Sequence, residues 1–436
     1  MSTEASTTAT TSSTGGAPAP AAGRGGAGAP HPMIACRGVS RVFGPDPEGA
    51  LALAREGVPR AEVQRRTGAT VAVHDVSFDV APGELFVVMG LSGSGKSTLV
   101  RMLNRLIDPS AGSIALDGHA LEDVSDSELR ELRNARVSMV FQHFALFPHR
   151  SVRDNAAYGL KVRGAPASEQ RERADWALQT VGLGDQGDAR PAQLSGGMKQ
   201  RVGLARALAT DADVLLMDEP FSALDPLIRR EMQDLLLRLQ GELRKTVVFI
   251  THDLNEAMRI GDRILLLKDG RVVQLGTGAE IVASPADDYV ADFVADVDRT
   301  RVLTAGDVVH EPRVVARLSD RPEEVLRRLG EAESTGAYVL DDDRHVVGVA
   351  LDGALATAAG RGADTIPPDA LRGEWSTTPA DRPLIDLVHL VGKDVVPLAA
   401  VDADGRLVGV VPRAAVLDAL SVGQTKGGRR AAPAAG

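Results

Sequence analysis

The sequence predicts an α/β fold built on a mainly parallel sheet, followed by a smaller α+β unit. Three continuous apolar runs at 85–89, 214–217 and 246–250 are typical of parallel strands that are covered on both faces. These runs alternate with longer helical stretches, and such alternation predicts a parallel sheet flanked by helices. The helical stretches lie at 98–106, 198–209 and 227–243. An internal repeat beyond residue 300 predicts the second unit.

Composition divides the 436 residues into four parts. Residues 1–30 and 425–436 are mostly small and polar, so they cannot bury enough apolar surface to offset the entropy of ordering, and we expect two disordered tails. The change of texture between the tails predicts a first domain over 31–297 and a second over 298–424. Within the first domain we expect a helical insertion at 45–70, between the first two strands.

The internal repeat relates residues 337–355 to residues 399–417 without a gap. Val347-Gly348-Val349 falls on Val408-Gly409-Val410, an offset of 61 residues. Each copy has the pattern of a strand, an acidic turn, a second strand and a helix. One repeat at this spacing predicts a tandem pair that packs together as a regulatory unit.

The composition excludes several classes of protein. A formal net charge of −10 argues against a general nucleic-acid binder, and 3% aromatic residues are too few for a surface that stacks many bases. The single Cys36 excludes an internal disulfide and a Cys-rich metal site. No run approaches the roughly 18 consecutive apolar residues of a membrane helix, and the N-terminus does not resemble a secretory signal. We therefore expect a cytoplasmic chain.

A phosphate-binding loop is predicted between the first apolar run and the helix that follows it. The run GLSGSGKST at 90–98 matches G-x-x-x-x-G-K-[ST] in the strand–loop–helix context that this motif requires. Its glycines let backbone N–H groups approach phosphates at a helix N-terminus. We expect Lys96 to reach the β- and γ-phosphates and the Ser97 hydroxyl to ligate Mg²⁺. The predicted nucleotide-binding residues here are Gly90, Ser92, Gly93, Ser94, Gly95, Lys96, Ser97 and Thr98.

Two carboxylates close the apolar run at 214–217. A carboxylate at the end of a buried parallel strand faces the crevice where such sheets bind ligands. We expect Asp218 to serve the Mg²⁺ site, and Glu219 to orient or deprotonate an attacking water. An acidic pair alone is more often a helix cap, and the phosphate loop earlier in the chain favours the catalytic interpretation.

A second anion-binding helix start is predicted at LSGGMKQR, residues 194–201. Ser195 and the two glycines that follow precede a helix, whose N-terminal N–H groups attract anions. An ordinary N-cap is the alternative, because Ser is favoured at that position. The neighbouring motifs favour the anion-binding interpretation over the ordinary N-cap.

Taken together, these motifs resemble those of an ABC-transporter ATPase subunit. The order is phosphate loop, Gln142 in VFQ, LSGGMKQR, MDEP, SALD at 222–225 and Thr251-His252-Asp253. Further similarities are the insertion, FQHFALFPH at 141–149, Met198, DLNEAMRIGDRI at 253–264 and a repeat pair resembling tandem CBS domains. With these further similarities, the chain resembles more specifically the ATP-binding subunit of glycine betaine/proline (quaternary amine) importers. The resemblance covers nearly all of residues 33–420.

The resemblance implies a P-loop ABC ATPase domain with a helical subdomain, followed by a tandem CBS pair. It implies that Gln142 contacts Mg²⁺ and the lytic water, and that His252 holds the γ-phosphate and this water. Ser195 and Gly197 would touch the γ-phosphate of the ATP bound to the opposite protomer. Asp225 would lie at the dimer seam.

Two places depart from the family pattern. Phe43, in VFG, matches the aromatic residue that stacks on adenine, but the insertion follows it directly, so a core Phe is the alternative. The repeats lack the hydroxyl and Asp residues with which many CBS domains hold adenosine ligands, so we do not expect ordinary AMP- or ATP-type binding there. The residues at these positions are Leu351, Pro412, Ala354 and Ala415.

The implied function is ATP hydrolysis at the inner face of the cell membrane by a homodimer that uses Mg²⁺. This homodimer would drive a separate membrane permease that imports a quaternary-amine compatible solute under osmotic regulation. Quaternary ammonium groups are recognised by aromatic cages, so a chain poor in Tyr and Trp leaves the solute to a separate solute-binding protein. The alternatives are an ABC ATPase for another small solute, such as an amino acid, and a regulatory nucleotide-binding module outside transport.

Overall fold

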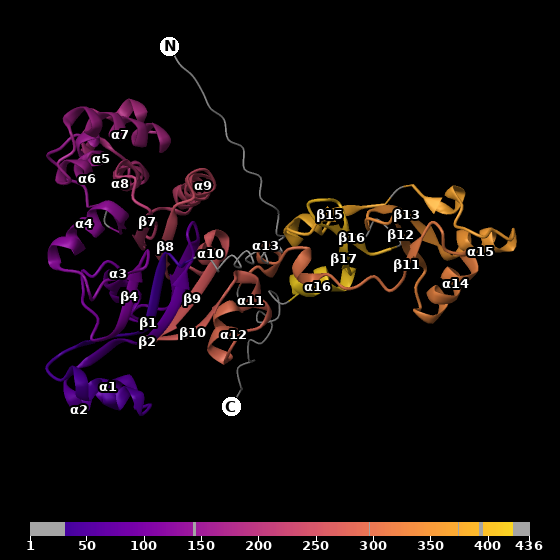
Figure 1. Cartoon of the computed structure of the whole chain (residues 1–436), viewed down its shortest axis with the longest axis horizontal. Helices are drawn as coiled ribbons and strands as arrows, with labels where there is room; N and C mark the ends of the chain where they lie inside the picture. Colours follow the sequence, from indigo (N-terminus) through magenta and orange to yellow (C-terminus); the bar gives the residue numbers. More distant parts are fainter. Residues whose placement is uncertain (1–30, 143–144, 296, 374, 392–395, 422–436) are drawn as a thin grey trace, which may run out of the picture.

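The computed structural model describes residues 31–142, 145–295, 297–373, 375–391 and 396–421 (Figure 1). The two tails predicted to be disordered lie outside the described residues. No helix within the described ranges is long and apolar enough to span a membrane.

A six-stranded sheet forms the centre of the first part of the chain, in the order β10-β9-β3-β8-β7-β6. Pairing is parallel from β9 through β3, β8 and β7 to β6, and antiparallel between β9 and β10. This confirms the predicted parallel sheet and the three predicted strands. The bounds are β3 (Leu85–Met89), β6 (Val137–Phe141), β7 (Val214–Asp218), β8 (Thr246–Thr251), β9 (Arg263–Lys268) and β10 (Arg271–Gly276).

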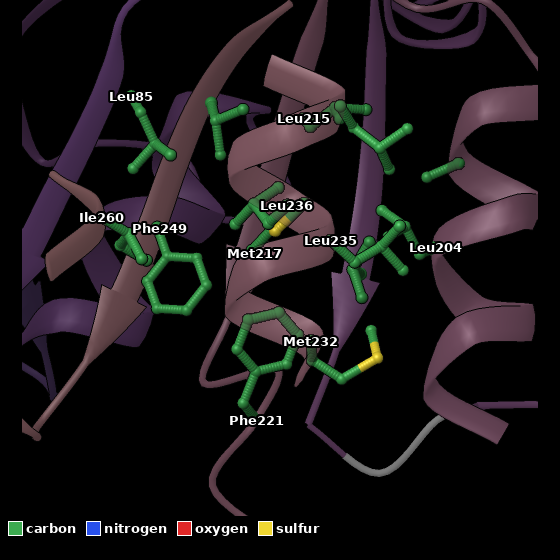
Figure 2. Close-up of a cluster of buried hydrophobic side chains, with 14 of the residues drawn as sticks. Leu85, Leu204, Leu215, Met217, Phe221, Met232, Leu235, Leu236, Phe249 and Ile260 are labelled. Carbon is green, nitrogen blue, oxygen red and sulfur yellow. The ribbon is translucent and has the colours of Figure 1, made fainter. Parts of the chain in front are cut away.

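Helices cover this sheet because its strands are apolar on both faces. Figure 2 shows Met217 and Phe249 of the sheet against Met232 and Leu236 of α9, and burial of this apolar area favours the layered packing. The three predicted helices are α3 (Lys96–Leu103), α8 (Gly196–Ala209) and α9 (Pro226–Leu243). The remaining helices of this part are α4 (Asp126–Arg136), α5 (Val152–Ala156), α6 (Tyr158–Val162), α7 (Ala167–Thr180), α10 (Leu254–Ile260), α11 (Gly278–Ala283) and α12 (Asp288–Val294).

An antiparallel sheet in the order β2-β1-β4-β5, which the sequence analysis did not predict, lies against the first one. Phe78 of β2 stacks on Phe86 of β3 with ring centroids 5.0 Å apart, so the two sheets share a core. Between β1 and β2 the predicted insertion forms two helices, α1 and α2, joined in one apolar cluster by Leu51 and Val63. The bounds are β1 (Ile34–Phe43), α1 (Pro47–Arg55), α2 (Arg60–Thr67), β2 (Thr70–Val80), β4 (Ala111–Leu116) and β5 (His119–Ala120).

The C-terminal part contains two small sheets that repeat one pattern, as the 61-residue offset predicts. Val339 pairs with Gly348 in the first copy, and Ala400 pairs with Gly409 in the second. The first copy comprises β11 (Val315–Arg317), α14 (Pro322–Glu331), β12 (Gly336–Leu340), β13 (Val346–Leu351), α15 (Asp352–Gly360) and β14 (Leu371–Arg372). The second comprises β15 (Thr377–Pro379), β16 (Leu398–Val401), β17 (Leu407–Val411) and α16 (Arg413–Ser421), and the short α13 (Arg299–Val302) precedes both copies.

Candidate functional site

The phosphate loop lies between β3 and α3 and depends on glycine at two points. Gly90 has φ 151° and Gly95 has φ 103°. A Cβ at Gly90 would lie 2.1 Å from the carbonyl oxygen of Leu267, and one at Gly95 would lie 2.4 Å from that of Ala72. Neither approach is possible for a residue with a side chain, so the close turn of the loop requires glycine at these two positions.

Lys96 is buried where the loop meets the carboxyl edge of the sheet. Its Nζ donates to the carbonyl oxygens of Gly90 and Leu91 at 2.8 and 3.2 Å, and lies 3.9 Å from Oε1 of Glu219. Burial lowers the pKa of Lys96, and the carboxylates of Glu219 and Asp218 oppose that shift. A phosphate oxygen arriving at the loop would therefore meet a partly desolvated cation.

Ser97 and Asp218 form a pair of hard oxygen donors beside this lysine. The Ser97 hydroxyl donates a 2.9 Å hydrogen bond to Oδ1 of Asp218. The guanidinium of Arg101 lies 3.7 Å from the other carboxylate oxygen. Hydroxyl and carboxylate oxygens are the ligands that Mg²⁺ prefers, so the donor set fits this ion.

Glu219 follows β7 in a left-handed conformation, with φ 47°. This conformation is uncommon outside glycine, and such backbone strain gathers at functional sites. His252 follows the neighbouring strand β8, and its Nδ1 lies 3.0 Å from Oε2 of Glu219. The carboxylate and the imidazole therefore meet at the edge where the parallel strands end.

Gln142 reaches this edge indirectly. Its Nε2 donates to Oγ of Ser222 at 3.1 Å, and that hydroxyl donates to the carbonyl oxygen of Glu219 at 2.9 Å. The amide is thereby tied to the backbone of Glu219. Ser222 is not among the predicted site residues, although it belongs to the SALD motif, because the motif alone does not show which partner its hydroxyl meets.

A cavity of about 370 Å³ opens in front of the loop. Phe43 lines it with 41% of its surface exposed, and is therefore not a core residue. Arg60 of α2, which was not predicted, also lines it and donates to the carbonyl oxygen of Gly93 at 2.9 Å. No general phosphate-loop pattern includes an inserted helix, so the sequence carried no signal for Arg60. The predicted residues in the lining are Phe43, Ser92, Gly93, Gly95, Lys96, Ser97, Thr98 and Glu219.

Comparison with known proteins agrees with this geometry. Residues 73–222 match the family described as ABC transporter. The chain is 46% identical, over 383 residues, to the glycine betaine/carnitine transport ATP-binding protein GbuA of Listeria monocytogenes, covering 88% of this chain and 96% of that protein. The chain belongs to the ABC-transporter ATP-binding proteins.

Two further relatives of this ABC-transporter ATP-binding protein extend the comparison. The glycine betaine/proline betaine transport system ATP-binding protein ProV of Salmonella typhimurium is 44% identical over 387 residues, with 87% of this chain and 95% of that protein covered. The structure of cbiO1 from Clostridium perfringens, part of the ABC transporter complex cbiONQ, aligns with a TM-score of 0.50 at 28% identity. That alignment covers 60% of this chain and 94% of the other. This likeness confirms the ABC ATPase fold of the first domain.

The predicted residues Ser195, Gly197 and Asp225 lie at the starts of α8 and α9 in this ABC-transporter ATP-binding protein, outside the phosphate loop. Ser195 caps α8 by accepting from the backbone N–H of Met198 at 3.3 Å, and Asp225 caps α9 in the same way. A Cβ at Gly197 would lie 2.4 Å from the Ile228 side chain, so the starts of the two helices pack closely. Ser195 and Asp225 are exposed, and none of Ser195, Gly197 and Asp225 is among the described residues that line the loop cavity.

Proposed function

We propose that this chain hydrolyses ATP with Mg²⁺ and thereby energises import of a quaternary amine through a separate membrane permease. The observation that carries the proposal is the convergence of Lys96, the Ser97–Asp218 pair and the Glu219–His252 pair at one sheet edge. A phosphate loop alone binds nucleotide, whereas a carboxylate held beside it supports turnover.

In this mechanism the loop amides and Lys96 hold the β- and γ-phosphates. Ser97 and Asp218 would hold Mg²⁺, which supplies positive charge against the phosphoryl oxygens. Glu219 accepts the hydrogen bond of the attacking water and takes its proton as the water oxygen bonds to the γ-phosphorus, while the bond from that phosphorus to the bridging oxygen breaks and ADP leaves. His252 orients Glu219 through its Nδ1 and presents its other ring nitrogen to the γ-phosphate. Gln142, which acts through Ser222, links the backbone of Glu219 to the end of β6.

The complete site needs a second copy of the chain. Ser195 is exposed and Gly197 is buried in the first turn of the same helix, so Ser195 and the first N–H groups of α8 are the groups that would meet the ATP held by the other protomer. A helix N-terminus that arrives in trans would stabilise the γ-phosphate charge that the first loop leaves open. Asp225, on the same surface, would lie at the seam. Phe43 lines the loop cavity with an exposed ring, and this supports stacking on adenine.

The relatives support a proposal for the class of solute. Two proteins at 44–46% identity are named for transport of glycine betaine with carnitine or with proline betaine. We propose the same solute class here, with solute recognition by a separate binding protein and this chain at the inner face of the cell membrane.

The C-terminal repeats at 298–424 are proposed to regulate transport as a tandem CBS pair. Support comes from the two copies of one strand pattern, joined by Tyr338, whose hydroxyl donates to the carbonyl oxygen of Pro397. The repeated acidic turns at Asp341 and Asp402 make charge a more suitable input than an adenosine ligand.

Reconstitution in lipid vesicles tests the proposal. The chain, its permease and the binding protein would be assembled with ATP inside, and uptake of labelled glycine betaine, carnitine, proline and choline measured. We expect ATP-dependent uptake of glycine betaine that is lost in Glu219→Gln. Uptake of an amino acid alone would contradict the solute class, and absence of ATP hydrolysis in the assembled complex would contradict the catalytic roles.

A further inference from the structure

A second cavity, of about 570 Å³, lies between the inserted helices and the edge of the sheet. Its lining residues come from α1 and α2 and from β2, β9 and β10. These elements are labelled in Figure 1. This volume is in the range that holds small organic ligands. The mechanism above does not use this cavity.

The lining of the cavity is cationic. Four basic side chains line it, and two carboxylates, Asp269 and Asp287, oppose them, so two positive charges remain unbalanced. Asp287 is already occupied as the cap of α12, where it accepts from the backbone N–H of Val290 at 2.9 Å. Among the residues that the structure describes, no ion pair involves any of the four basic side chains, which are Arg55, Arg60, Lys268 and Arg271.

His74 supplies the second observation, a buried polar atom without a partner. The residue is 4% exposed, lines the cavity, and its Nδ1 has no hydrogen-bond partner within the described part of the chain. Burial lowers the pKa of this imidazole, and the nearby Arg271 and Arg55 act in the same direction, whereas Asp75 opposes the shift. An oxygen ligand that reached this nitrogen would supply the hydrogen bond that it lacks.

We propose that this cavity binds a small organic phosphate. The phosphate would lie at Arg55, Arg271 and His74, because guanidinium groups bind phosphate through paired charge-assisted hydrogen bonds. A phosphate monoester carries close to two negative charges at neutral pH, which matches the unbalanced charge of the lining. The apolar lining of Val63 and Val71 would receive the organic part.

Two connections link this cavity to the phosphate loop. Arg60, which lines both cavities, donates to the carbonyl oxygen of Gly93 at 2.9 Å. The backbone N–H of His74 donates to the carbonyl oxygen of Gly270 at 2.8 Å, and Gly270 N–H donates to that of Ser94 at 3.0 Å. A ligand at Arg55, Arg271 and His74 that shifts His74 or the adjacent Arg60 would change nucleotide affinity, and the coupling would be reciprocal. This coupling rests on the proposed nucleotide site, whereas binding in the cavity does not.

Calorimetric titration of the full chain with phenyl phosphate tests the binding. Saturating ADP and Mg²⁺ keep the nucleotide site filled. Inorganic phosphate is added in a parallel titration as a competitor for the phosphate position. We expect one phenyl phosphate per chain, with at least tenfold weaker binding in Arg55→Gln and Arg271→Gln, which change exposed side chains, and in His74→Phe. Arg66→Gln, on the neighbouring helix α2 but outside the lining, is the control for loss of one arginine charge and should bind like the parent chain. No binding of phenyl phosphate at millimolar concentration, or an affinity in the two arginine variants equal to that of the parent chain, would overturn the site.

The coupling is measured as the Kd of ADP with and without phenyl phosphate. We expect a change of several-fold in the parent chain that disappears in Arg271→Gln. A change of the same size in Arg271→Gln would place phenyl phosphate at the nucleotide site and overturn the coupling. Unchanged ADP affinity despite binding of phenyl phosphate would also overturn it. Failure of the parent chain to bind ADP at all would count against the proposed function, not against the cavity.

Discussion

Nδ1 of His252 lies 3.0 Å from Oε2 of Glu219, and the two residues follow neighbouring parallel strands. Asp218 and Ile250 are partners in the sheet register, so β7 and β8 end side by side. The register therefore places the imidazole where it holds the carboxylate near the phosphate loop. Several consequences of this arrangement and of its surroundings are measurable.

Glu219→Gln keeps the size and hydrogen-bonding capacity of the side chain but removes the base. We expect ATP hydrolysis to fall at least ~10²-fold while ATP binding persists, as measured by phosphate release and nucleotide titration. ATP should then hold the protomers together as a stable dimer in gel filtration, because it is no longer consumed. Glu242→Gln, an exposed carboxylate away from the site, is the control. Near-normal turnover in Glu219→Gln would remove this residue from its catalytic role.

Ser195→Arg should block ATP-driven dimerisation while leaving nucleotide binding by the monomer intact. The reason is that Ser195 lies outside its own loop cavity, and a bulky cation would occupy the surface that meets the partner. Lys96→Ala should instead weaken nucleotide binding itself, through loss of the charge at the phosphates. Mixed dimers of the two variants retain one composite site, and we expect them to recover part of the ATP-dependent association. Loss of monomeric binding in Ser195→Arg would disprove the trans arrangement.

Phe43→Ala should weaken ATP binding by about 5- to 30-fold, the effect of losing roughly 1–2 kcal/mol of ring stacking. Phe43→Trp should preserve affinity, because a larger ring offers the same face. Fluorescence titration with ATP and with inorganic triphosphate separates the two parts of the ligand. The affinity for triphosphate should not change in either variant. Equal loss for both ligands would indicate a structural role for Phe43.

His345 should titrate above its ordinary pKa of 6.5, because its Nδ1–H donates a hydrogen bond to the carboxylate of Asp341 and this bond raises the pKa. Its Nε2 meets the carbonyl oxygen of Asp404 in the other repeat at 3.1 Å. Folding raises this pKa, so the protonated ring, through its contacts with Asp341 and Asp404, stabilises the repeat pair fully below pH 6.5. This contribution to stability is lost as the pH rises through the raised pKa. An NMR titration of the ring proton, identified by its loss in His345→Gln, should show a lower pKa in Asp341→Asn. An unchanged pKa in that variant would contradict the pairing.

Deleting residues 300–436 should leave ATPase activity intact but remove the salt dependence of transport in the reconstituted complex. The repeats carry acidic turns, and attraction or repulsion at such charges is screened over ~8–10 Å at physiological salt. Uptake measured across a series of salt concentrations, with the full chain as reference, provides the test. A truncated transporter with the same activation curve would assign salt sensing to another part of the complex and leave the repeats with a structural role.

Local sequence determined much of this protein. The strand at 85–89, the turn at Gly90 and Gly95 and the start of α3 are neighbours in the chain, so their apolar content, glycine conformations and helix preference act directly on one another. The same holds for the two inserted helices and for each copy of the repeat. In all these cases neighbouring residues decide the structure, and the prediction from sequence was correct.

Only the tertiary structure decided which distant residues meet. The hydrogen bonds from Ser97 to Asp218, from Gln142 to Ser222 and from Arg60 to Gly93 join segments 33 to 121 residues apart. The antiparallel sheet and the cationic cavity around His74 arise in the same way. These contacts depend on strand register and on how apolar faces pack against each other, and both are properties of the whole buried core. A pattern along the chain identifies candidate residues, whereas the packing of the core determines the distances between them.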